Sequence, residues 1–80
     1  MIKQNRNKYT EYEKKFLERI GMRIRLLRTE KKISQEELGH LSDYDRTYIG
    51  GIERGERNIT IIALKKLSDA LQCDITDILK

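Results

Sequence analysis

The sequence has no proline and no tryptophan, and its one cysteine is Cys73. A single cysteine excludes an internal disulfide, and the simpler interpretation is a protein of a reducing compartment. No apolar run approaches the length of a membrane-spanning helix, and the chain does not open on a basic segment followed by an apolar one, as a signal peptide does. These absences predict a cytoplasmic protein with no membrane partner.

The residues of enzyme and metal sites are also scarce. His40 is the only histidine, and no second His or Cys stands at ligand spacing, which favours a surface or half-buried role over metal binding. The carboxylates are scattered, and the chain has neither a glycine-rich phosphate loop nor a nucleophile motif. We therefore expect no enzyme activity, no cofactor and no metal. Cys73 is most simply a small buried apolar residue.

Positive charge is abundant but unevenly distributed. The net charge of this 80-residue chain is +4. Residues 1–32 hold 11 lysines and arginines against 4 acidic residues, whereas residues 33–80 hold 6 against 9. A basic half beside an acidic half is typical of a surface that binds a polyanion, although a merely solvated surface explains the charges equally well.

The spacing of apolar residues predicts an all-α fold. Residues 1–9 lack apolar periodicity and predict a flexible arm, and residues 10–80 predict one helical domain of modest core. The first helix is expected from about residue 10 to residue 30, because apolar residues recur there every three or four positions. Its expected inward face is Phe16, Leu17, Ile20, Ile24 and Leu27.

Four shorter helices are expected after the first, each from a local signal. The second helix should turn Leu38 and Leu41 inward, and the segment "DITDILK" predicts a short fifth helix. The boundaries of these helices are predicted from side chains that cap helix starts and from a glycine that ends a helix. In chain order these are Ser34 with Glu37 as a capping box, Asp45, Gly55 as the stop, and Thr60.

The second and third predicted helices form a helix-turn-helix candidate. If Ile49 and Ile52 point inward, the outer side of the third helix carries two arginines, a threonine and two glycines. Arginine can donate two hydrogen bonds to guanine, and threonine offers a hydroxyl and a methyl group. An interior glycine costs about 1 kcal/mol relative to alanine, which favours either a bare surface that approaches DNA closely or relief of crowding between helices. The outer residues are Arg46, Thr47, Gly50, Gly51 and Arg54.

Residues 20–79 resemble the lambda-repressor/Cro-like helix-turn-helix regulators, through "IGMRIRLLRTEKKISQEELGHLS", "RTYIGGIERGERNITI" and "LKKLSDALQCDITDIL". The segment "DRTYIGGIERGERNIT" is most similar to the controller proteins of bacterial restriction-modification systems, although phage-type regulators share much of it. The resemblance implies a five-helix DNA-binding domain. It also implies a buried salt bridge between Arg28 and Glu53, against the alternative of two unconnected surface charges. The DNA contacts expected from resemblance and spacing together are Gln35, Arg46, Thr47, Tyr48, Gly50, Arg54, Arg57 and Asn58.

Two residues depart from the pattern of that family near the turn. Gly39 stands where the family usually has alanine, and Asp43 stands where it usually has glycine. Aspartate tolerates a left-handed conformation, so the turn is expected to survive. Gly39 is expected to let the two short helices pack more closely, and Gly50 replaces a frequent serine and so lacks its hydroxyl.

One recognition helix reads few base pairs, which predicts a homodimer on a palindromic operator of double-stranded DNA. Ile75, Ile78 and Leu79 predict the dimer interface, unless they simply close the bundle. So small a domain has no room for a sizeable ligand pocket, so we expect no small-molecule effector. The resemblance implies autoregulation of a restriction-modification operon, with RNA polymerase as a further partner. The alternatives are a phage-type repressor and an antitoxin-like module whose helices also bind a protein.

Overall fold

The computed structural model describes residues 9–80, and this part of the chain consists of helices and connecting turns without a strand. The all-α prediction is therefore confirmed for the described residues. Of the predicted arm, residues 1–9, only Tyr9 belongs to the described residues, and its side chain is exposed. The helices are α1 (Glu11–Glu30), α2 (Gln35–Ser42), α3 (Arg46–Glu53), α4 (Ile61–Ala70) and α5 (Ile75–Ile78).

Three helices begin at the caps that the sequence predicts, and α1 begins at a capping box formed by Thr10 and Glu13. The Thr10 hydroxyl accepts a hydrogen bond from the Glu13 amide at 3.0 Å, and the Glu13 carboxylate accepts one from the Thr10 amide at 2.8 Å. Each bond satisfies an amide that the first turn of a helix leaves without a partner. Equivalent side-chain caps open the next three helices at Ser34, Asp45 and Thr60.

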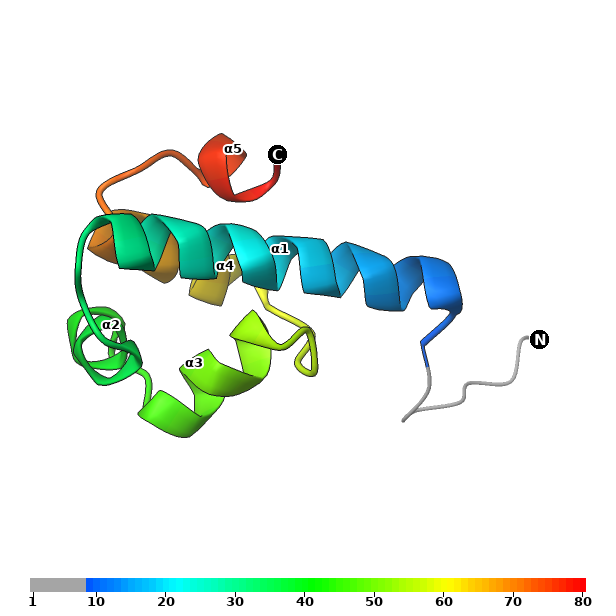
Figure 1. Ribbon diagram of the computed structural model, residues 1–80, viewed down its shortest axis with the longest axis horizontal. Coiled ribbons are helices and arrows are strands. Elements are labelled where there is room, and N and C mark those ends of the chain that lie inside the picture. The colour runs from blue at the N-terminus through cyan, green and yellow to red at the C-terminus, as the bar shows by residue number, and fades with distance from the viewer. Residues whose placement is uncertain (1–8) are drawn as a thin grey trace.

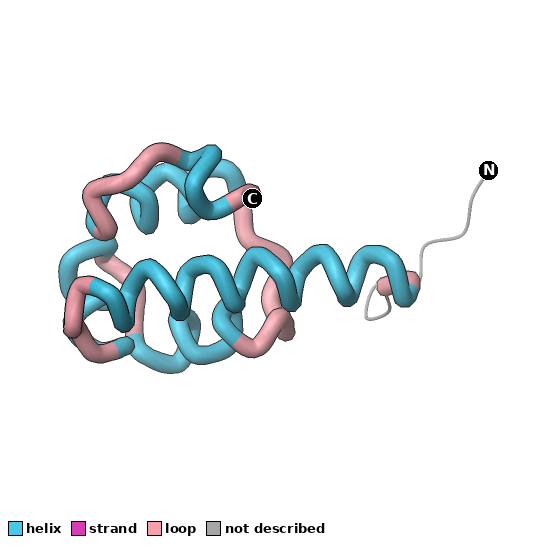
Figure 2. Tube along the Cα trace, turned by 45° about the horizontal axis from the view of Figure 1, so that its top comes forward, coloured by secondary structure: helices cyan, strands magenta, loops and turns pink. Residues whose placement is uncertain are grey.

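α1 is the longest element of the chain and packs against α3 and α5, whereas α2 packs against α3 and α4. In Figure 1, α3 lies below α1, α4 behind it and α5 above it, while α2 closes the end opposite the N-terminus. The N-terminal part of α1 extends beyond the other helices in both Figure 1 and Figure 2. The packed body of the protein is therefore built on the C-terminal part of α1.

The core contains one residue that the sequence assigned elsewhere. Ile24, Leu38, Ile49 and Leu71 are fully buried, and so is Ile78 of the short α5. Ile78 therefore contributes to the core of its own protomer, where full burial of such a side chain stabilises the fold by about 1.5–3 kcal/mol. No surface of Ile78 is left for the predicted contact between protomers, whereas Leu79 is 42% exposed and Ile75 is half-buried.

Two apolar residues expected in the core lie at the surface. Phe16 is 40% exposed on α1, although the adjacent Leu17 is buried. Leu41 is 60% exposed because α2 turns a different face inward, with Leu38, Gly39 and Ser42 buried. The Ser42 hydroxyl donates a hydrogen bond to the Leu38 carbonyl oxygen at 2.7 Å, so this polar side chain is buried with its donor paired.

The turn between α2 and α3 lies close against α2. Asp43 adopts the left-handed conformation with φ of 66°, as expected for this residue at a helix end. The Tyr44 amide then donates to the Gly39 carbonyl oxygen at 2.8 Å, and a Cβ atom on Gly39 would collide with the Tyr44 carbonyl oxygen. Gly39 therefore allows the close approach of the turn to α2.

Candidate nucleic-acid interface

The first turn of α3 presents the predicted reading residues to solvent. Arg46 and Thr47 are the first two residues of α3, and both are exposed. The Asp45 carboxylate caps the helix by accepting from the Tyr48 amide at 2.8 Å. A helix start that carries an arginine and a hydroxyl can donate hydrogen bonds to a base edge or to a phosphate, and the helix dipole favours the anion.

A buried ion pair holds the other end of α3 against α1. The Arg28 Nε donates to Glu53 Oε2 at 2.6 Å, and Nη2 donates to Oε1 at 3.0 Å. The side chains are only 12% and 3% exposed, so the predicted buried salt bridge is present. Arg28 also donates to the Ile33 carbonyl oxygen at 2.9 Å, and its pKa is raised chiefly by the hydrogen bond to Glu53.

Gln35 joins this pair rather than standing free at the surface. Its Nε2 donates to Glu53 Oε1 at 3.0 Å, and the side chain is half-buried. The start of α2 is thereby tied to the end of α3, with Glu53 as the shared acceptor. One of the two N–H donors of the Gln35 amide is used inside the protein, so its predicted contact with DNA would fall to the second N–H or to Oε1.

The two adjacent glycines of α3 are buried, which corrects the expectation of a bare surface. A Cβ atom on Gly50 would lie 3.1 Å from Arg54 Nη1 and 3.7 Å from Gln35 Oε1. A Cβ atom on Gly51 would lie 2.9 Å from Arg57 Cγ. Long side chains of this protein therefore cover both positions, and the contact of Gly50 with DNA stays a prediction.

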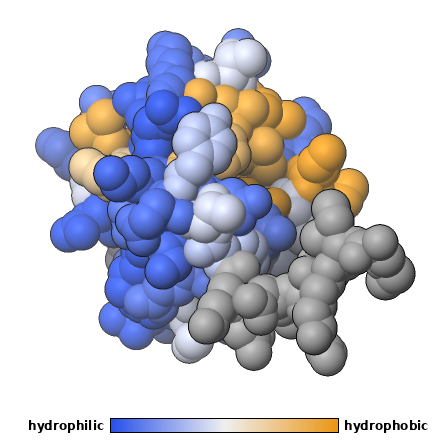
Figure 3. Space-filling view, turned by 90° about the vertical axis from the view of Figure 1, so that its right-hand side faces the viewer, coloured by the Kyte–Doolittle hydropathy of each residue, from blue (hydrophilic) through white to orange (hydrophobic). Residues whose placement is uncertain are grey.

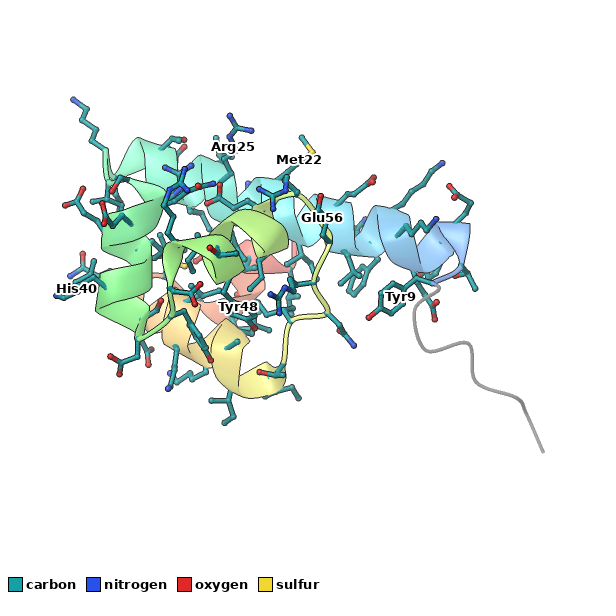
Figure 4. The ribbon with its side chains drawn as sticks, turned by 90° about the horizontal axis from the view of Figure 1, so that it is seen from below. Tyr9, Met22, Arg25, His40, Tyr48 and Glu56 are labelled. Carbon is teal, nitrogen blue, oxygen red and sulfur yellow. The ribbon has the colours of Figure 1, made fainter. Side chains whose placement is uncertain are left out.

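Aromatic and cationic side chains stack beside α3. The ring of Tyr48 lies 4.6 Å from that of Tyr44, centroid to centroid. The Arg57 guanidinium lies over the Tyr48 ring at 5.4 Å, and Lys66 Nζ lies over the Tyr44 ring at 5.4 Å. Figure 4 shows Tyr48 on the side of α3 that faces α4. Burial is the largest cause that raises the pKa of Tyr48. Tyr44 raises this pKa further, and Arg57 lowers it.

This stack was missed in the sequence, because Tyr44 lies in the turn before α3, where the spacing of helical neighbours does not apply. Two basic residues, Arg54 and Arg57, and the amide Asn58 lie exposed at the end of α3 and in the loop that follows it. Arg54 Nε pairs with Glu56 Oε2 at 3.1 Å, where both side chains are exposed. The structure thus brings Thr47, Tyr48 and Arg57 together around one surface groove, whereas the Arg46 side chain lines a separate groove beside α2.

His40, for which the sequence predicts no metal-binding role, is exposed on α2. It lines the same groove as Arg46 and lies apart from Tyr48 in Figure 4. Cys73 is half-buried, and burial is the first cause that raises the pKa of its thiol. Among residues 9–80, no three His, Cys, Asp or Glu side chains gather as metal ligands would. Within residues 9–80, no helix is both long enough and apolar enough to cross a bilayer.

Comparisons with known proteins identify the class to which this arrangement belongs. Residues 24–78 match the Helix-turn-helix family. The control protein C.BamHI of Bacillus amyloliquefaciens is 42% identical over 60 residues, which cover 74% of each chain. The control protein C.MunI of Mycoplasma sp is 38% identical over 61 residues, which cover 75% of this chain and 82% of that protein.

A solved structure gives the same result for the fold. The restriction-modification controller protein C.AhdI of Aeromonas hydrophila superposes with a TM-score of 0.76 and 45% identity, covering 78% of this chain and 94% of that protein. The chain therefore belongs to the helix-turn-helix family of DNA-binding transcription regulators, and its relatives there include the controller proteins of restriction-modification systems.

Proposed function

We propose that the chain binds a palindromic operator as a homodimer and regulates the transcription of a restriction-modification operon. The observation that carries the proposal is the exposed pair Arg46 and Thr47 at the start of a helix whose other end is tied by the Arg28–Glu53 pair. A reading side chain discriminates between bases only if its helix is held in one position. The buried pair supplies that rigidity to α3.

The remaining exposed cations suit the DNA backbone. Arg54 and Arg57 follow the recognition helix, and Asn58 adds an amide donor beside them. Phosphate contacts set the register of a protein on the duplex, whereas base contacts specify the sequence. We assign Arg46 and Thr47 to base edges, and we assign Arg54, Arg57 and Asn58 to phosphates and sugars.

The proposed dimer uses apolar residues that remain at the surface of α4 and α5. Ile61 and Ile62, at the start of α4, are 79% and 63% exposed, and Leu79 directly after α5 is 42% exposed. In Figure 3 an apolar area occupies the upper right of the visible face, next to hydrophilic surface. A second copy related by a two-fold axis would bury such residues and place two α3 helices on one DNA duplex.

Sedimentation of a charge series at micromolar concentration tests the dimer. Leu79→Asp should give folded monomers, because Leu79 keeps surface that a second copy would cover. Leu41→Asp is the matched control, since Leu41 is 60% exposed on α2, and it should leave the dimer intact. Ile78→Asp should instead unfold the protomer, because it places a carboxylate in the core. A wild-type protein that sediments as a 9.5 kDa monomer would overturn the dimer.

The regulated system is tested separately, by the genes that flank this one. A neighbouring nuclease and methyltransferase would support the restriction-modification assignment. A toxin or phage genes in their place would favour the alternatives of an antitoxin-like module or a phage-type repressor. In either case autoregulation is tested by binding of the wild-type protein to DNA upstream of its own gene together with the change in transcription from that DNA.

A further inference from the structure

The chain reverses direction at the end of α3, and the reversal brings Arg57 back onto the helix. Gly55 has φ of +76°, a conformation that favours glycine. The Gly55 amide donates to the Ile52 carbonyl oxygen at 3.0 Å, and the Glu56 amide donates to the Gly51 carbonyl oxygen at 2.9 Å. Both bonds satisfy acceptors that the end of a helix leaves open. The side chain of Arg57 therefore lies directly over Gly51.

The side chain of Arg57 occupies the space that a side chain at position 51 would need. An ideal Cβ atom on Gly51 would lie 2.9 Å from Arg57 Cγ, 3.5 Å from Nε and 3.8 Å from Cδ. The contact is made by the middle of the side chain and not by its flexible end. From this position the guanidinium reaches the face of the Tyr48 ring at 5.4 Å, within the range of a cation–π interaction.

We infer that Gly51 is a positioning residue for Arg57. The missing Cβ atom forms a seat on α3 in which the aliphatic part of Arg57 lies, and the Tyr48 ring supports the guanidinium. The seat holds the charge of Arg57 beside α3 before DNA binds, which lowers the entropy that a long side chain loses on binding. This inference rests on the proposed function, in which Arg57 contacts the DNA backbone.

The neighbouring glycine provides a matched comparison. A Cβ atom on Gly50 would meet Arg54 at Nη1, the far end of a side chain that already pairs with an exposed glutamate, Glu56. That end can move without displacing the rest of the residue. Alanine raises the intrinsic helix propensity equally at positions 50 and 51, by about 1 kcal/mol. A difference between the two alanine variants therefore reports the contact and not the stability of α3.

A double-mutant cycle tests the seat. The probe is a fluorescent duplex that the wild-type protein selects from a random-sequence pool, with a scrambled duplex of equal length as the reference. Gly51→Ala should weaken binding to the selected duplex about tenfold, the scale of one hydrogen bond to a charged group. Gly50→Ala should weaken it less. In an Arg57→Ala background, Gly51→Ala should cause no further loss, because the residue that it positions is gone.

A second pair of variants covers the case in which Gly51→Ala does not fold. Tyr48→Phe keeps the ring under the guanidinium, and Tyr48→Leu removes it. The difference in affinity between these two variants should disappear in the Arg57→Ala background. The dependence of binding on salt gives a further measure, since losing one phosphate contact lowers the slope by about one.

The outcomes separate the seat from the function on which it rests. Equal losses from Gly51→Ala in both backgrounds would show that position 51 acts without Arg57, and would overturn the inference. Full affinity in Gly51→Ala together with weak binding by Arg57→Ala would also overturn it, while the role of Arg57 would stand. Unchanged binding by Arg57→Ala would instead remove the proposed backbone contact, and with it the reason for a seat.

Discussion

The longest helix and the recognition helix are stabilised in opposite ways. α1 has 20 residues, of which only Leu17, Ile20, Gly21 and Ile24 are buried. α3 has 8 residues, and five consecutive ones, from Ile49 to Glu53, are buried. A helix of 8 residues is not stable alone in water, whereas 20 residues with a capping box approach local stability. The helix proposed to read DNA therefore depends more than α1 on the surrounding protein for its position.

The largest effect should come from breaking the buried pair that holds α3. Glu53→Gln leaves the Arg28 charge with 12% exposure and no counter-charge, which should destabilise the fold by about 3 kcal/mol. Urea or thermal unfolding measures the change.

Glu56→Gln is the control for that change, because it removes the partner of an exposed arginine and should alter the stability by less than about 0.5 kcal/mol. If the two variants unfolded alike, the contrast between a packed α3 and a solvated surface would be lost.

A smaller effect is expected from Arg46→Ala at the exposed tip of α3. The variant should keep its unfolding midpoint and lose about 1–3 kcal/mol of binding to the selected duplex, with relaxed preference at one base pair per half-site. Gel shifts over single-base variants of the duplex measure both quantities.

Arg25→Ala is the matched control for Arg46→Ala, because Arg25 is an exposed arginine on α1 (Figure 4). Any loss of affinity that it causes should be the same for every duplex. Uniform weakening by Arg46→Ala as well would assign Arg46 to a phosphate instead of a base.

The smallest effect should come from the cap of α1. Thr10→Ala removes the hydrogen bond to the Glu13 amide, and caps of this kind contribute about 1 kcal/mol. Here the loss should be smaller, because the first turns of α1 lie beyond the other helices and can fray without unfolding the body. Thr60→Ala, the cap of α4, should cost more. Amide hydrogen exchange distinguishes them: the first should accelerate exchange only near the start of α1, the second throughout the core.

Much of the fold was predictable because the signals are local. Thr10, Ser34, Asp45 and Thr60 each cap the helix that follows within three residues, so a short window of sequence contains both partners. The left-handed turn at Asp43 is local in the same sense. The Arg28–Glu53 pair is different, because its partners stand 25 residues apart, and only the resemblance to a family with this pair pointed to it.

By itself, therefore, the sequence determined the helix starts, the helix-turn-helix order and the exposed Arg46 and Thr47 at a helix N-terminus. Only the tertiary structure decided which apolar residues face inward and what covers the glycines. Ile78 and Leu79 are adjacent and equally apolar, yet one is fully buried and the other is 42% exposed. Gly51 is covered by Arg57, six residues later, because the chain reverses at Gly55. Periodicity gives the spacing of a helical face, but its rotation toward a neighbour is set by packing among helices that are distant in sequence.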